Sequence, residues 1–141
     1  MSQQLQRLSK RDAVTRLKAL QALKALAVEK PAEDVCSILP SWPSVFARLV
    51  MDANRSVRSE SCQVMGAIAT AAGRGLAPYL KALLPSWYLA QFDGYAYVAS
   101  AARSSLHAAF PGDKQRGAVL HCKAEVWTAW VGQCRTASVG L

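Results

Sequence analysis

The segment Asp52-Ala53-Asn54-Arg55-Ser56-Val57-Arg58 (DANRSVR) begins one of the long helical stretches of this chain, and related segments stand on both sides of it. Aspartates also occur at positions 12 and 93, so the three aspartates are spaced by 40 and 41 residues. Five residues after them come the apolar residues Leu17, Val57 and Val98. Self-similarity at a fixed period of this length indicates one supersecondary unit stacked on copies of itself.

Apolar residues recur every three or four positions through most of the chain, which indicates amphipathic helices. Asp12 can cap a helix that ends before Pro31. Further helical stretches are predicted over residues 32–39, 54–72, 76–92, 97–110 and 114–134. The sequence contains no alternating β-branched run and no Asn-Gly hairpin signal, so we expect an all-α fold.

A period of about 40 residues that carries two helices is typical of HEAT and armadillo repeats. An aspartate in the turn can accept hydrogen bonds from amides of the second helix and from an arginine of a neighbouring repeat. We therefore expect Asp52 and Arg58 to belong to a structural ladder. The prediction is an all-α, HEAT/armadillo-like α-solenoid with about three helical-hairpin repeats and open ends. Its expected divisions are a repeat domain over 1–136, with repeats near 5–30, 31–73 and 75–111 and a further helix over 113–135, and a tail over 137–141.

The two ends of the predicted stack lack partners. A helix pair cannot bury its apolar face alone and has to pack on neighbouring pairs. The first repeat is missing most of its leading helix, and the last helix, with Trp127 and Trp130, is followed by no partner. We expect this chain to be a piece of a longer solenoid or a truncated gene product.

The tetrapeptide Leu-Pro-Ser-Trp occurs twice, at residues 39–42 and 84–87. The two copies are 45 residues apart, which exceeds the spacing of the aspartates by about one helical turn. We interpret the tetrapeptide as part of a bent first helix in two successive repeats. Its proline would mark the bend, and Trp42 and Trp87 would pack inward.

Composition sets further limits. The 141 residues are 52% hydrophobic, which favours a folded core over disorder. Lys and Arg number 17 against 9 Asp and Glu, and the net charge of +8 attracts polyanions such as RNA, although basic residues also keep helices soluble. No secretory signal or membrane-spanning segment is evident, and the four cysteines have no paired spacing, so we expect a cytosolic protein without membrane contact.

Catalytic and metal-binding constellations were not found. The only histidines are His107 and His121, and they form no C-x-x-C or similar ligand set with the cysteines. Cys62 lies on an apolar helix face, where an activated nucleophile is not expected. The aromatic residues at helical spacing are interpreted as core residues: Trp42, Trp87, Tyr88, Phe92, Trp127 and Trp130. We predict no catalytic residue, no metal site and no cofactor in this chain.

Four segments together resemble the N-terminal region of the listerin family, the large RING-type E3 ubiquitin ligases of ribosome-associated quality control. They are LQRLSKRDAVTRLKALQAL (5–23), ILPSWPSVFARLVMDANRSVRSES (38–61), LAPYLKALLPSWYLAQFDGYAYVASAARSSLHAAFP (76–111) and LHCKAEV (120–126). The sequence departs from the family after about Val131 and in its Gly73-Arg74-Gly75 link.

The resemblance implies an N-terminal HEAT-like module of a long curved solenoid. In that family this end docks on the separated large ribosomal subunit and its nascent-chain-sensing partner. A C-terminal RING, which would hold zinc and recruit the ubiquitin-charged E2, is absent here, so this chain alone should not ligate ubiquitin.

The basic turns are the candidate binding residues. Lys10, Arg11, Asn54 and Arg55 match the turns of the family, and their charge also allows contact with ribosomal RNA. The alternative is a generic HEAT-repeat adaptor that binds a transport or cytoskeletal protein through the same turns.

Overall fold

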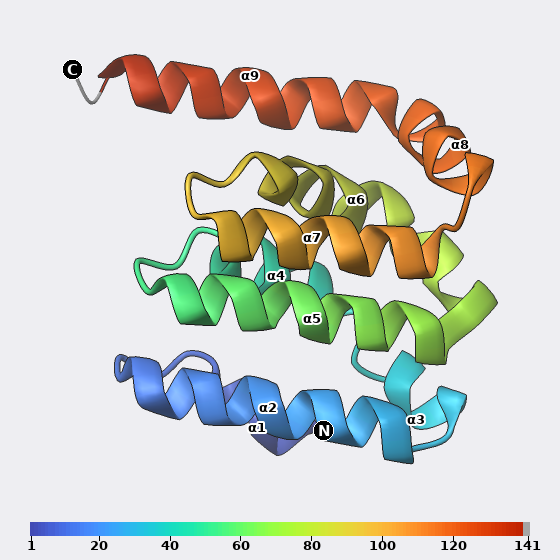
Figure 1. Ribbon diagram of the computed structural model, residues 1–141. Coiled ribbons are helices and arrows are strands. Elements are labelled where there is room, and N and C mark those ends of the chain that lie inside the picture. Colours follow the sequence, from blue (N-terminus) through green and yellow to red (C-terminus); the bar gives the residue numbers. More distant parts are fainter. Residues whose placement is uncertain (140–141) are drawn as a thin grey trace.

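The computed structural model describes residues 1–139, with side chains for residues 1–136, and that part of the chain contains helices and no strand. The prediction of an all-α, solenoid-like fold is confirmed (Figure 1). The helices are α1 (Ser2–Arg7), α2 (Ala13–Glu29), α3 (Ala32–Cys36), α4 (Trp42–Leu49), α5 (Arg55–Ala72), α6 (Leu80–Leu89), α7 (Ala96–Ala109), α8 (Asp113–His121) and α9 (Lys123–Val139), with 3-10 helices η1 (Gly73–Tyr79) and η2 (Ala90–Phe92). None of the described helices is long and apolar enough to cross a bilayer.

The helices form two layers. Figure 1 shows α2, α5 and α7 as successive rows of one layer, with α4 and α6 behind them. Helix α5 packs against both α2 and α7, while α4 contacts α5 and α6. Helix α1 packs on α2, and α9 packs on α6 and α8. The core lies between the two layers, and each hairpin completes it only by packing on its neighbour.

The helix caps set the register of the repeat. The Asp12 carboxylate accepts a hydrogen bond from the Thr15 N–H at 3.1 Å, and the Asn54 side chain accepts from the Ser56 N–H at 2.9 Å. Asp12 and Asn54 are therefore the equivalent N-caps of α2 and α5. The sequence prediction matched Asp12 with Asp52, but in the structure Asp12 corresponds to Asn54, two residues later. An aspartate can serve as the N-cap, as Asp12 does, or as the turn residue two positions before the N-cap, as Asp52 does.

The two tetrapeptide tryptophans are buried without exposed surface, which confirms that they pack inward. The Trp42 Nε1–H donates to Met65 Sδ at 3.1 Å, and the Trp87 Nε1–H donates to Ser105 Oγ at 2.8 Å. The backbone differs between the copies. The first copy lies at the break before α4, whereas Pro85 of the second lies inside α6. The first copy therefore separates α3 from α4 instead of bending one helix, and the second copy is part of a single helix.

Helices α5 and α7 approach closely at Gly66. A Cβ atom at this position would lie 2.8 Å from Ser105 Cβ, which is too close for two carbon atoms that are not bonded. The absence of a side chain at Gly66 therefore allows the close packing of α5 on α7.

The C-terminal part differs from the prediction in two respects. The single helix expected over 113–135 is two helices, separated at the buried Cys122. Helix α9 continues to Val139, so the tail expected over 137–141 does not begin at 137, and residues 140–141 lie outside the described residues. The leading helix of the first repeat is the short α1.

The aromatic residues that were predicted to lie in the core differ in exposure. Trp42 and Trp87 are fully buried, as predicted. Phe92, Trp127 and Trp130 are 72%, 64% and 48% exposed, so the interpretation of these three as core residues was wrong. Helical spacing identifies one face of a helix, but it does not reveal whether another element covers that face.

Candidate binding surface at the turn edge

The three turns that precede α2, α5 and α7 lie together at the left edge of the stack in Figure 1. We call this surface the turn edge and define it by residues 8–12, 50–55 and 92–97. All four sequence-predicted binding residues lie there and are exposed: Lys10, Arg11, Asn54 and Arg55. The fold thus brings together two turns that are more than 40 residues apart in the sequence.

Two arginine–aspartate pairs link the three turns. Arg16 Nε lies 2.9 Å from Asp52 Oδ2, and its second guanidinium nitrogen donates to Asp52 Oδ1 at 3.0 Å. Arg58 Nε lies 2.9 Å from Asp93 Oδ2 in the same way. The four side chains are 11–15% exposed. The expected ladder is therefore present, and its aspartates pair with the arginine of the preceding repeat.

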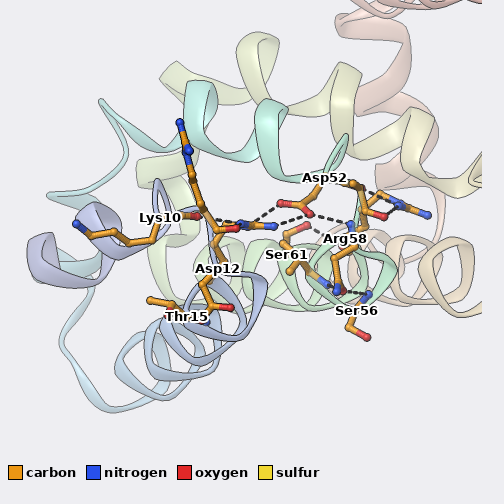
Figure 2. A network of polar contacts seen from close by, with 12 residues as sticks. Lys10, Asp12, Thr15, Asp52, Ser56, Arg58 and Ser61 are labelled. Carbon is orange, nitrogen blue, oxygen red and sulfur yellow. Dashed lines mark hydrogen bonds and ion pairs between the residues drawn. The ribbon is translucent and has the colours of Figure 1, made fainter.

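The side chains of Arg16 and Arg58 also donate hydrogen bonds to backbone carbonyls of the turns. Arg16 Nη1 donates to the carbonyls of Lys10 and Arg11 at 2.9 and 2.6 Å, and Arg58 Nη1 donates to the Asp52 carbonyl at 2.7 Å. Figure 2 shows this network around Asp52 and Arg58, with the Lys10 side chain directed away from it. Because the carbonyls are used internally, the turn conformation is fixed while the side chains of Lys10 and Arg11 stay in solvent.

Asp52 and Asp93 also shape the start of the next helix. Asp52 Oδ1 accepts from the Asn54 N–H at 2.9 Å, and Asp93 Oδ1 accepts from the Tyr95 N–H at 2.9 Å. Each carboxylate thus orders its own turn and receives an arginine from the previous one. Charge-assisted hydrogen bonds, in which an arginine donates to a carboxylate, are shorter and stronger than hydrogen bonds between neutral groups.

Once Arg16 and Arg58 are counted with the aspartates that they pair with, the turn edge keeps three basic side chains, those of Lys10, Arg11 and Arg55, against the one carboxylate of Asp12. Arg16 and Arg58 are neutralised by their aspartates. Among the residues with described side chains, no carboxylate lies within ion-pair distance of Lys10, Arg11 or Arg55. These three side chains are available to an anionic partner.

Asn54 and Arg55 have different local roles. The Asn54 side-chain oxygen accepts from two amides of α5, at 2.9 Å from Ser56 and 3.2 Å from Val57. The Arg55 guanidinium carbon lies 5.2 Å from the centroid of the Tyr95 ring, a cation–π arrangement. Asn54 therefore positions the helix start, and Arg55 is held over the next turn with its charge exposed.

Sequence reasoning missed several apolar residues of this edge. Met51, Phe92 and Tyr97 are 67%, 72% and 87% exposed. Tyr97 and Tyr95 border a hollow of about 400 Å³, whose other walls include Leu17 and Arg55. Exposed aromatic, Met and Arg side chains are enriched at protein–protein interfaces, and aromatic rings also stack on unpaired bases. The one available sequence signal was the Asp93-Gly94 turn, which separates these aromatics from the helix interiors.

The described residues contain no group of three or more His, Cys, Asp or Glu side chains that could hold a metal ion. Burial raises the pKa of the Cys62 thiol to about 12, so this thiol stays protonated at neutral pH and is a poor nucleophile. Hydrogen bonds from Thr15 lower the pKa of Asp12, in agreement with its role as a helix cap.

Comparison with known proteins identifies the family. A family model for the N-terminal domain of the E3 ubiquitin-protein ligase listerin matches residues 1–132. E3 ubiquitin-protein ligase listerin of Gallus gallus is 39% identical over 122 residues, covering 86% of this chain and 7% of the relative. Listerin of Mus musculus is 39% identical over 124 residues, with 88% and 7% covered, and that of Drosophila melanogaster is 36% identical over 124 residues, with 86% and 7% covered. The chain spans about 7% of the length of these relatives. It belongs to the listerin family and corresponds to its N-terminal domain.

Proposed function

We propose that this member of the listerin family is a docking module that binds the large ribosomal subunit carrying a stalled nascent chain. In that role it supports ubiquitination of the nascent chain in ribosome-associated quality control, in the cytosol. The nascent-chain-sensing partner on the subunit is a second contact. The observation that carries the proposal is the turn edge, where unpaired basic side chains and exposed aromatics stand on turns fixed by two ion pairs.

The geometry of the turn edge suits a large, repetitive and anionic surface. Packed helices lie about 8–10 Å apart, so successive turns present their side chains at that interval. Lys10, Arg11 and Arg55 can contact phosphates, while Phe92 and Tyr97 can stack on unpaired bases or pack against a protein. Because the turns are held by internal hydrogen bonds, little conformational freedom is lost on binding.

Ubiquitin transfer is assigned to a RING outside this chain. That RING would hold zinc and recruit the E2, so we expect no discharge of ubiquitin from a charged E2 by residues 1–141 alone. A discharge rate above the buffer control in a single-turnover assay would contradict this division of roles.

The test is co-sedimentation of the chain with purified large ribosomal subunits that carry stalled peptidyl-tRNA, over a series of salt concentrations. Each phosphate contact contributes about one unit to the slope of log affinity against log salt. The combined variant Lys10→Glu, Arg11→Glu and Arg55→Glu is expected to lose at least tenfold in affinity and about three units of slope. The matched control reverses Lys114, Arg116 and Lys123, which are exposed on α8 and α9.

Unchanged binding of the turn-edge variant, or an equal loss in the control, would overturn the assignment of the surface. Selective binding of a transport or cytoskeletal protein without any affinity for ribosomal subunits would overturn the docking role and favour the adaptor function.

A further inference from the structure

We propose that the outer face of α2, α5 and α7 is a second binding site, which takes an acidic amphipathic peptide segment of another protein. The proposal goes beyond ribosome docking and does not depend on it. We call this surface the helix face and define it by three stripes of residues, which are 17, 21, 24 and 28 on α2, 56, 60, 63, 67 and 71 on α5, and 97, 101, 105 and 108 on α7.

The helix face carries two hollows that lie along the same stripes. Residues spaced by three or four positions share one side of a helix, so the stripes on the three helices form one continuous surface. The larger hollow, of about 620 Å³, lies toward the C-terminal ends of the helices, and the smaller one, of about 400 Å³, lies toward their N-terminal ends. The ion pair between Lys24 and Glu60, at 2.5 Å, stands between them.

The larger hollow is lined mainly by small apolar side chains. Ala67, Ala71 and Ala101 form part of its wall, and Val28, at its rim, is 79% exposed. The hydroxyl of Ser105 accepts from Trp87 at 2.8 Å and donates to the Ala102 carbonyl at 3.0 Å. Since this polar group is already used inside the fold, the hollow itself suits apolar side chains of a ligand.

The charged residues around the two hollows determine whether an acidic or a basic partner fits. Glu60 is the one carboxylate among their lining residues, and Lys24 pairs with it. The remaining charged lining residues are Lys30 and Arg55, and neither lies within ion-pair distance of a carboxylate in the part of the chain with described side chains. The acidic Glu29 is exposed beside Lys30 but does not line the hollow.

Lys30 and Arg55 lie at opposite ends of the helix face. Lys30 follows the C-terminus of α2, and Arg55 begins α5, which packs alongside α2. A helix of 17 residues is about 25 Å long. The site therefore fits an amphipathic segment of roughly that length, with apolar side chains in the hollows and acidic residues near both ends.

The test is a titration of the isotope-labelled 141-residue chain, followed by amide chemical shifts. The probe is a synthetic 17-residue peptide with leucines along one helical side and glutamates elsewhere. Matched probes carry lysine for every glutamate, or serine for every leucine. We expect shifts around both hollows, in residues 17–30, 55–71 and 95–108, and at least tenfold weaker binding of both matched probes. Equal binding of the lysine probe, or shifts confined to other surfaces, would overturn the proposal.

A matched pair of variants separates the helix face from the rest of α2. Val28→Glu places a carboxylate at the rim of the larger hollow, whereas Val14→Glu makes the same change at a 57% exposed position that lines neither hollow. We expect Val28→Glu to weaken the glutamate peptide at least fivefold, and Val14→Glu to leave its affinity unchanged, with equal thermal unfolding of both variants. Equal affinities for the two variants would contradict the site. Loss of ribosomal-subunit binding in Val28→Glu would assign the face to the ribosomal interface instead and would also overturn it.

Discussion

The joint between α5 and α7 and the joint between α6 and α9 both stack one helix on the next, but they are built differently. At the first joint Gly66 permits close contact, and Arg58 and Asp93 pair at 2.9 Å with side chains 13% and 15% exposed. At the second, Lys81 and Glu125 are 3.9 Å apart and their side chains are 58% and 36% exposed. Trp127 and Trp130 lie on α9 with ring centroids 5.4 Å apart, and their side chains are 64% and 48% exposed.

We expect the stack to be more stable at its centre than at its C-terminal helix. The central joint combines tight packing with an ion pair that also shapes the binding turns. Helix α9 packs on α6 and α8, and among the described residues its Trp127 and Trp130 side chains are left partly uncovered. The turn edge is therefore supported by the most firmly packed part of the molecule.

The largest expected difference is between two tryptophan substitutions. Trp87→Ala removes a fully buried side chain and its hydrogen bond to Ser105, and should lower the free energy of unfolding by about 3–5 kcal/mol. Trp127→Ala, at a 64% exposed position, should lower it by less than about 1 kcal/mol. Urea denaturation followed by circular dichroism measures both. Similar losses for the two variants would show that the α6–α9 joint is as tightly packed as the centre.

The ion pair between Arg58 and Asp93 should contribute more to stability than the pair between Lys81 and Glu125. Asp93→Ala leaves Arg58 without its partner and removes the bond to the Tyr95 amide, and we expect a loss of about 2–3 kcal/mol. Glu125→Ala should change stability by less than about 0.5 kcal/mol, because its pair is long and exposed. A double-mutant cycle with Arg58→Met isolates the first coupling energy. A coupling near zero would mean that the ladder does not stabilise the stack.

Hydrogen exchange should reveal the difference without mutation. Amides of α5 are expected to exchange only through global unfolding, whereas those of α9 should open locally and exchange at least a hundredfold faster. Exchange followed by mass spectrometry at neutral pH measures both helices in one sample. Equal protection would remove the distinction between the two joints.

The smallest effect concerns two neighbouring residues of the turn edge. Asn54→Ala removes the cap of α5 and should cost about 1 kcal/mol of stability, with little change in ribosome binding at temperatures where the chain stays folded. Arg55→Ala should have the opposite profile, with near-normal stability and weaker binding. Thermal unfolding and co-sedimentation of both variants check this, and identical profiles would show that the cap and the binding residue cannot be separated.

The sequence was sufficient for the fold class, the two-helix repeat and the burial of Trp42 and Trp87, because these depend on periodicity. It did not determine the register, since Asp12 fits the pattern both as a cap and as a turn residue. It also did not reveal the exposure of Phe92. Whether an apolar side chain is covered depends on a second element, and the spacing within one helix carries no information about that element.

The candidate site was partly predictable for the same reason. Charge and turn position were enough to select Lys10, Arg11 and Arg55, which the fold leaves exposed. The stacking of Arg55 on Tyr95 joins residues 40 positions apart, and only the packing of two repeats brings them together.

The most direct test of the account is a footprint of the chain on the large ribosomal subunit, obtained by hydroxyl-radical labelling of free and bound chain. Exposed aromatic and sulfur-containing side chains report well in this method, and the turn edge contains Met51, Phe92 and Tyr97, while α9 offers Trp127 as an internal reference. Trp130 does not serve as a reference, because it lines the same hollow as Met51 and Phe92. We predict that binding protects Met51, Phe92 and Tyr97 and leaves Trp127 unchanged. Protection confined to Trp127, or labelling that binding does not alter, would contradict this prediction.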